Sequence, residues 1–121
     1  LGDVYKRQKQ ARYRAALAAY DEARLAYEQK VLTVFKEADD AVVTYRSARK
    51  TAALKLNLRD AASKYVELAH LQYRAGSTNY IDVLDAQRRY FDAQIGLSNS
   101  VRDEHLALVQ LYKALGGGWT E

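Results

Sequence analysis

The feature that most restricts the fold is a stretch of helix-forming residues that runs from Lys9 to Gln72 without a break. The chain of 121 residues contains no Pro, and this stretch is rich in residues that favour helices, namely Ala, Leu, Lys, Arg, Glu and Gln. Within it one apolar row repeats every seven residues: Tyr13, Tyr20, Tyr27, Val34, Ala41 and Ala48. A sustained seven-residue repeat predicts a coiled-coil seam, so we expect one long helix over about residues 9–73.

The one strong break in this pattern predicts a turn at residues 75–79. Gly76 can adopt the left-handed conformation that closes a helix. Three residues that can cap a following helix come next: Ser77, Thr78 and Asn79. A second helix is then expected over about residues 80–115, and the glycines of residues 116–121 end it. Because the turn is short, the two helices should form an antiparallel hairpin.

The two arms of this hairpin are unequal in length. Counting outward from the turn places Leu84 near Ala69. Leu115, at the end of the second helix, then lies near Ala38. The apolar stripe from about Tyr13 to Phe35 therefore has no partner within the chain. We predict an all-α fold, a long antiparallel two-helix coiled-coil hairpin, whose remaining stripe must meet other helices because a hairpin buries too little alone.

Composition excludes several classes of function. Without Cys there is no disulfide framework, Cys-based zinc site or thiol nucleophile. His70 and His105 lie far apart, no nucleophile and base can be paired, and we expect neither an enzyme nor a cofactor or metal site. The net charge of +4 is modest. We interpret the tyrosine row as core or interface and expect no nucleic-acid binding, although basic residues gather near the start: Lys6, Arg7, Lys9, Arg12 and Arg14.

Two motifs resemble a known family. Residues 73–87, Tyr-Arg-Ala-Gly-Ser-Thr-Asn-Tyr-Ile-Asp-Val-Leu-Asp-Ala-Gln, resemble the periplasmic-tip segment of TolC-like outer-membrane efflux proteins. Residues 111–119, Leu-Tyr-Lys-Ala-Leu-Gly-Gly-Gly-Trp, resemble the C-terminal signature of the lipoprotein branch of that family, which serves multidrug efflux. The resemblance covers about Ala11 to Trp119. Residues 1–8 do not resemble the family, and we expect them to be an unrelated or artefactual end.

The resemblance implies a homotrimer in the outer membrane of a Gram-negative bacterium. In this family helices from three protomers form a periplasmic α-helical barrel, and strands absent from this chain form a shared membrane barrel. The chain looks like the last helical hairpin of a protomer, and so like a C-terminal fragment. Such a channel exports small molecules together with a periplasmic adaptor protein and, indirectly, an inner-membrane pump, and it is gated at the helical tip.

Asp82 and Asp85 are the first candidate site residues. They lie three residues apart and so share one face of a helix. The resemblance matches both to acidic residues that ring the closed periplasmic entrance, where clustered carboxylates attract cations and raise one another's pKa. The simpler alternative is that carboxylates in the first helical turns stabilise the helix dipole. Both roles are compatible. Arg88 and Arg89, which follow, are interpreted as a solvated face.

The turn carries the other candidates. Tyr73 matches a tip tyrosine whose hydrogen bonds to neighbouring helices act as a gate latch, with aromatic packing across the hairpin as the alternative. The exposed tip, Gly76, Ser77, Thr78 and Asn79, matches the surface that meets the adaptor, with a plain turn as the alternative. Thr78 departs from the family, whose best-known members carry a basic residue there, so the latch is expected to be weaker or differently built.

A second reading of the whole chain remains open at this point. A stand-alone coiled-coil hairpin, such as a stalk or the hairpin of a periplasmic adaptor, would also show two heptad-bearing helices and a tight turn. Such a hairpin should have arms of similar length, and the predicted arms differ.

Overall fold

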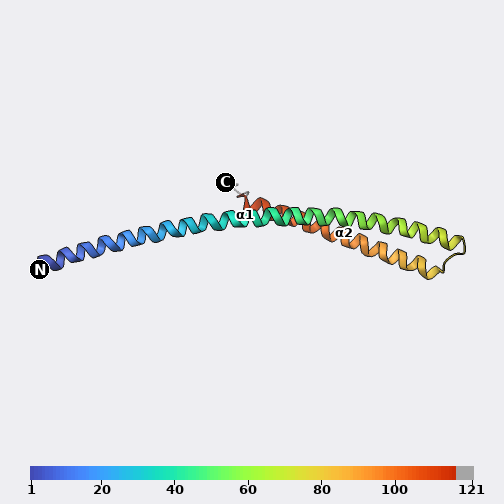
Figure 1. The fold of residues 1–121 in the computed structure, drawn as a ribbon, viewed down its shortest axis with the longest axis horizontal. Helices are drawn as coiled ribbons and strands as arrows, with labels where there is room; N and C mark the ends of the chain where they lie inside the picture. Colours follow the sequence, from blue (N-terminus) through green and yellow to red (C-terminus); the bar gives the residue numbers. More distant parts are fainter. Residues whose placement is uncertain (117–121) are drawn as a thin grey trace. The chain divides into compact units, whose positions relative to one another are not determined.

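A computed structural model describes residues 1–116, which form two helices (Figure 1). Helix α1 spans Gly2–Arg74 and helix α2 spans Tyr80–Ala114, with the turn between them. The predicted all-α hairpin is confirmed, and α1 begins at Gly2 rather than near residue 9. Most of the predicted Gly-rich exit, including Trp119, lies outside the described residues. Neither helix contains a segment apolar enough, over the length required, to cross a bilayer.

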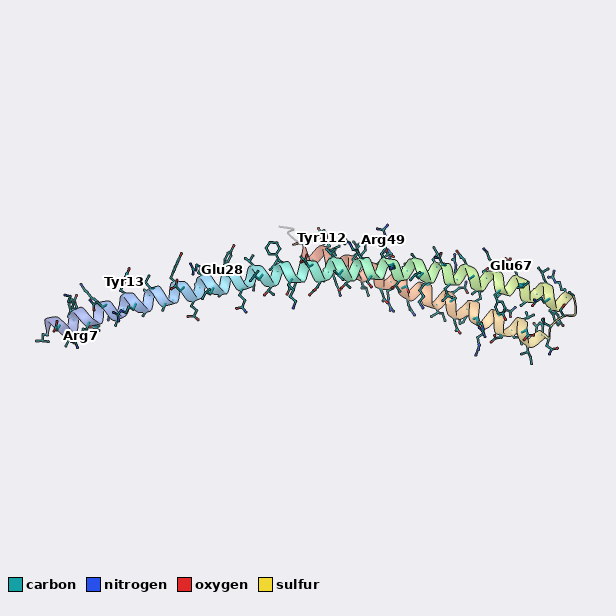
Figure 2. All side chains as sticks on the ribbon, viewed as in Figure 1. Arg7, Tyr13, Glu28, Arg49, Glu67 and Tyr112 are labelled. Carbon is teal, nitrogen blue, oxygen red and sulfur yellow. The ribbon has the colours of Figure 1, made fainter. Side chains whose placement is uncertain are left out.

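The chain divides into two compact units, residues 1–37 and residues 38–121. All of the first unit is described, and every residue in it except the half-buried Val31 is exposed. Tyr13, Tyr20 and Tyr27 are 67%, 68% and 70% exposed. Figure 2 shows the Tyr13 side chain projecting from the helix. The predicted stripe is therefore an uncovered apolar surface.

In the second unit the two helices pack along one seam, to which each helix contributes a row of side chains with heptad spacing. Covered side chains alternate at steps of three and four residues along both helices. On α1 this row is Ala38, Ala41, Tyr45, Ala48, Ala52, Lys55, Arg59, Ala62, Val66 and Ala69. On α2 they are Val83, Ala86, Tyr90, Ala93, Leu97, Ser100, Glu104, Ala107, Leu111 and Ala114. This alternation is the pattern of a coiled coil, and the many alanines keep the buried apolar surface small.

The best-packed part of the seam lies beside the turn. Ala69, Val83 and Ala86 form the buried cluster, with Val66 packed against it. Val83 is the largest fully enclosed side chain among the described residues. Further along, the Gln87 side-chain amide donates a long hydrogen bond of 3.4 Å to Nε2 of His70. This contact agrees, to within about one helical turn, with the register obtained by counting outward from the turn.

Gly76 ends α1, as predicted. Its φ of 75° lies in the left-handed region, which favours glycine. The Gly76 N–H donates to the Tyr73 carbonyl at 3.0 Å, and the Ser77 N–H donates to the Gln72 carbonyl at 2.9 Å. These two bonds define a Schellman motif, which satisfies carbonyls that would otherwise lack partners at the helix end.

Asn79 is the N-cap of α2, but its side chain makes no capping hydrogen bond. The expectation of side-chain capping is wrong at this residue. The Asp82 N–H, which a capping side chain would normally bind, donates instead to the backbone carbonyl of Asn79 at 3.1 Å. The turn therefore depends on backbone hydrogen bonds at both of its ends.

Candidate functional site at the hairpin tip

Asp82 and Asp85 both lie near the start of α2, but their surroundings differ. Asp82 is exposed, whereas the Asp85 side chain is 32% exposed and is held by two arginines. Nε of Arg89 donates to Oδ2 of Asp85 at 2.7 Å, and a terminal guanidinium nitrogen of Arg88 donates to Oδ1 at 3.1 Å. Among residues 1–116, no ion pair involves Asp82.

The arginines control the ionisation of Asp85. The hydrogen bond from Arg89 is the largest cause, and it lowers the pKa of the Asp85 carboxyl below its usual 3.8. Desolvation comes second and raises this pKa, while the charges of Arg89 and Arg88 and the hydrogen bond from Arg88 lower it. Within one chain the pKa of Asp85 therefore moves down. The rise expected from clustered carboxylates would require several copies of the chain.

Sequence reasoning missed the role of the arginines. Arg88 and Arg89 are exposed, as a solvated face requires, yet both bind Asp85. Their spacing of three and four residues from Asp85 is the spacing of ion pairs on a helix, and this was the available signal. It could not reveal which arginine makes the shorter contact, because that depends on the side-chain rotamers.

Tyr73 packs across the turn against Tyr80. The two ring centroids lie 5.3 Å apart with the planes tilted by 59°, a favourable arrangement for an aromatic pair. This is the packing that the alternative interpretation of Tyr73 expects. A latch requires a neighbouring helix, so that role stays a prediction.

The tip itself is accessible. Gly76, Ser77 and Asn79 are exposed, and Thr78 is half-buried. The Thr78 hydroxyl oxygen is enclosed and has no hydrogen-bond partner among the described residues. The adaptor-docking role of this surface also stays a prediction.

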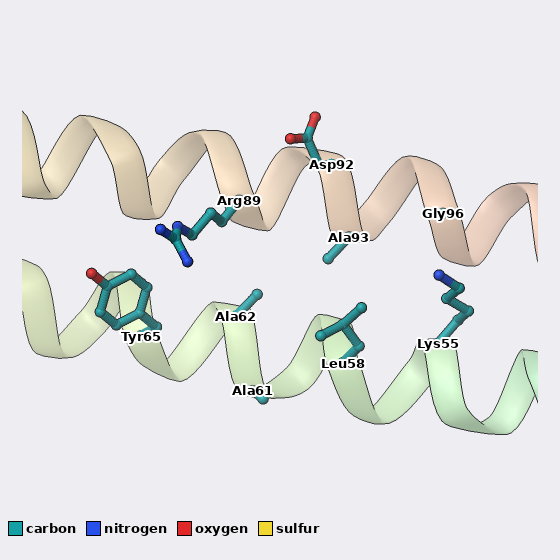
Figure 3. Close-up of a pocket in the computed structure, with 9 residues that line it drawn as sticks. All are labelled: Lys55, Leu58, Ala61, Ala62, Tyr65, Arg89, Asp92, Ala93 and Gly96. Atoms are coloured by element: carbon teal, nitrogen blue, oxygen red, sulfur yellow. The ribbon is translucent and has the colours of Figure 1, made fainter.

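A groove follows one flank of the hairpin close to Asp85. It encloses about 520 Å³ and is lined by Lys55, Leu58, Ala61, Ala62, Tyr65, Arg89, Asp92, Ala93 and Gly96. Figure 3 shows Arg89 extending from α2 toward Tyr65 of α1. The α1 wall is mostly apolar, whereas the α2 wall carries the charged residues Arg89 and Asp92. The groove therefore has one apolar wall and one charged wall.

The helical hairpin agrees with the fold of the family that the sequence motifs resemble. The family model described as "Outer membrane efflux protein" matches residues 6–117, and the chain belongs to this family. The match includes the last three of the first eight residues. Whether the residues before residue 6 are unrelated stays a prediction.

Individual relatives of the chain are outer membrane proteins of Pseudomonas. It is 39% identical over 94 residues to the toluene efflux pump outer membrane protein TtgI of Pseudomonas putida, covering 78% of this chain and 20% of that protein. It is 35% identical over 106 residues to the outer membrane protein OprJ of Pseudomonas aeruginosa, covering 88% of this chain and 22% of OprJ. The predicted outer-membrane, Gram-negative setting is confirmed at the level of the family.

A solved structure agrees with these relatives. The outer-membrane channel OprN superposes with a TM-score of 0.75 at 30% identity, over 91% of this chain and 25% of that chain. The chain thus spans about a fifth of the length of the two curated relatives. It corresponds in fold to a helical part of such a channel.

Proposed function

We propose that this chain forms part of the periplasmic tunnel of a trimeric outer-membrane efflux channel. The channel exports small molecules with a periplasmic adaptor and an inner-membrane pump, and it opens and closes at the hairpin tip. The chain serves as a conduit and contributes no catalysis.

The observation that carries this proposal is the hairpin as a whole. It is a heptad-seamed pair of helices with a glycine-closed tip, and it superposes on 91% of its length with part of the OprN channel. The exposed apolar stripe of residues 1–37 adds support, because a surface of this kind usually marks contact with other protein. A tunnel wall made of helices from several protomers supplies that contact.

The roles of individual residues belong to the same proposal. Asp82 and Asp85 form the pore constriction, Tyr73 contributes to the gate latch, and the tip of Gly76, Ser77, Thr78 and Asn79 docks the adaptor. In a trimer each Asp occurs three times around one axis, which concentrates negative charge at the narrowest point.

An exchange experiment tests the function. Residues 6–116 replace the matching segment of OprJ, and the resulting protein, the hairpin-exchange channel, is expressed in a strain that lacks its own channel. We expect outer-membrane trimers and recovery of drug resistance, measured as the minimal inhibitory concentration. Trimers that form normally but leave the strain as sensitive as one without a channel would overturn the proposal.

A further inference from the structure

A row of mostly polar residues on α2 runs beside the seam. Its members recur at steps of three and four residues: Asp82, Asp85, Arg89, Asp92, Gly96, Asn99 and Asp103. Four of the seven are carboxylates, and Arg89 is the one basic residue of the row. Arg89 is therefore the only side chain of this row that can form an ion pair with the carboxylates of the row.

Arg89 is fixed more firmly than its neighbour Arg88. It makes the shorter contact to Asp85, 2.7 Å against 3.1 Å. Its side chain also lines the groove with Ala62 and Tyr65 of the other helix, as Figure 3 shows. Both side chains are largely exposed, 73% for Arg88 and 65% for Arg89. What distinguishes Arg89 is its shorter contact to Asp85, made through Nε, and its place in the wall of the groove.

This arrangement gives the two candidate constriction residues different electrostatic roles. Asp85 faces a cation in direct contact, so its charge is largely cancelled at a distance. Asp82 lies in the same row and has no ion-pair partner among the described residues. A ring of Asp82 side chains would therefore attract cations more strongly than a ring of Asp85 side chains.

We propose that Arg89 is a specificity-determining residue of the constriction: it positions Asp85 and cancels its charge, so that the attraction for cations comes mainly from Asp82. The inference rests on the proposed function, because it requires Asp82 and Asp85 to face the conducting path. The residue acts through Asp85 and does not itself need to contact the exported molecule.

Ion conduction through the hairpin-exchange channel in planar bilayers provides the test. Arg89→Gln should lower the concentration of hexamminecobalt(III) that blocks half of the current by roughly threefold or more, because each of three carboxylates loses the closer of its two arginine partners. The reversal potential in a salt gradient should shift toward cation selectivity. Arg88→Gln removes the same formal charge from the neighbouring position and should have a clearly smaller effect.

Two further variants separate charge cancellation from a merely structural role. Arg89→Lys keeps the charge and should keep the wild-type block. The double variant Asp85→Asn with Arg89→Gln replaces one neutral pair by another and should also return block to the wild-type level. Equal effects of Arg88→Gln and Arg89→Gln, or a double variant that remains as sensitive as Arg89→Gln alone, would overturn the inference.

The same measurements distinguish this inference from the function on which it rests. Replacing Asp82 and Asp85 together by Asn tests the constriction itself. If that variant alters block but Arg89→Gln does not, the constriction stands and the role of Arg89 is wrong. If neither alters block, both are wrong.

Discussion

At the level of single residues, Asp85 is bound by two arginines and Asp82 by none of the described residues. Removing both carboxylates should widen the constriction and reduce its negative charge. We expect Asp82→Ala with Asp85→Ala to raise the single-channel conductance of the hairpin-exchange channel and to weaken block by multivalent cations. An unchanged current would contradict the constriction role. Asp103→Ala, in the same row but far from the tip, is the matched control.

The pKa of Asp85 gives a second prediction at this scale. Because Arg89 lowers that pKa, the pairing contributes stability that is present above 3.8 and is lost as the pH falls through the lower folded-state value. Carbon NMR of the Asp85 carboxyl in the 121-residue chain should give a midpoint below 3.8. In Arg89→Gln the titration midpoint of Asp85 should move back toward 3.8. An unchanged midpoint would show that Arg89 does not cause the lowered pKa.

At the level of elements, the turn exposes the proposed docking surface on a backbone that Gly76 fixes. Replacing Gly76 would strain its left-handed conformation, so Ser77 is the better probe. We expect Ser77→Trp to abolish drug resistance while outer-membrane trimers remain intact, because the bulky ring obstructs a docked partner. Ser77→Ala should leave the minimal inhibitory concentration unchanged. Normal resistance with Ser77→Trp would count against docking at the tip.

A larger side chain should destabilise the hairpin when it is placed in the seam and have little effect when it is placed on the exposed surface. Ala86 is fully buried between the helices, whereas Ala53 is exposed on α1. Ala86→Leu should destabilise the hairpin by about 1–3 kcal/mol, because a well-packed seam has no room for three more carbons. Ala53→Leu adds the same atoms in solvent. Thermal unfolding of the hairpin-exchange trimer, followed by loss of the trimer band, should separate the two variants, and equal midpoints would contradict the packing described.

The sequence predicts the helices and the turn better than it predicts the side-chain contacts of the site. Gly76 after an unbroken helical stretch predicts the turn, because the turn depends on local backbone geometry. The heptad row predicts the periodicity of the seam, but only its members Ala41 and Ala48 are half-buried, since the earlier ones lie beyond the end of α2. The prediction of a capping hydrogen bond at Asn79 is wrong, because the backbone carbonyl of Asn79 accepts the hydrogen bond from the Asp82 N–H instead. The spacing of four residues between Asp85 and Arg89 allows an ion pair, but the rotamers decide that Arg89 makes the shorter contact. The groove depends on the other helix, which no local pattern encodes.

At the level of the whole molecule, the exposed tyrosines of residues 1–37 require an explanation outside the described fold. If they meet other helices in the trimer, replacing Tyr13, Tyr20 and Tyr27 by Ser should reduce the yield of hairpin-exchange trimers, because each loses buried aromatic surface. The 121-residue chain on its own should self-associate less after the same change, as measured by analytical ultracentrifugation. Arg14→Ser, an exposed residue beside the row, serves as the control.

The compact turn also has a kinetic consequence. Gly76 and the backbone hydrogen bonds donated by Gly76 and Ser77 close a very short loop between the helices, and the entropy lost on closing a loop is smallest when it is short. Contacts near the turn should therefore form first, and contacts between the two helices should then form in order of their distance from the turn. The segment that carries Asp82 and Asp85 would then gain structure before the rest of the hairpin. The tyrosine stripe, which waits for partners from elsewhere, would be the last to be covered.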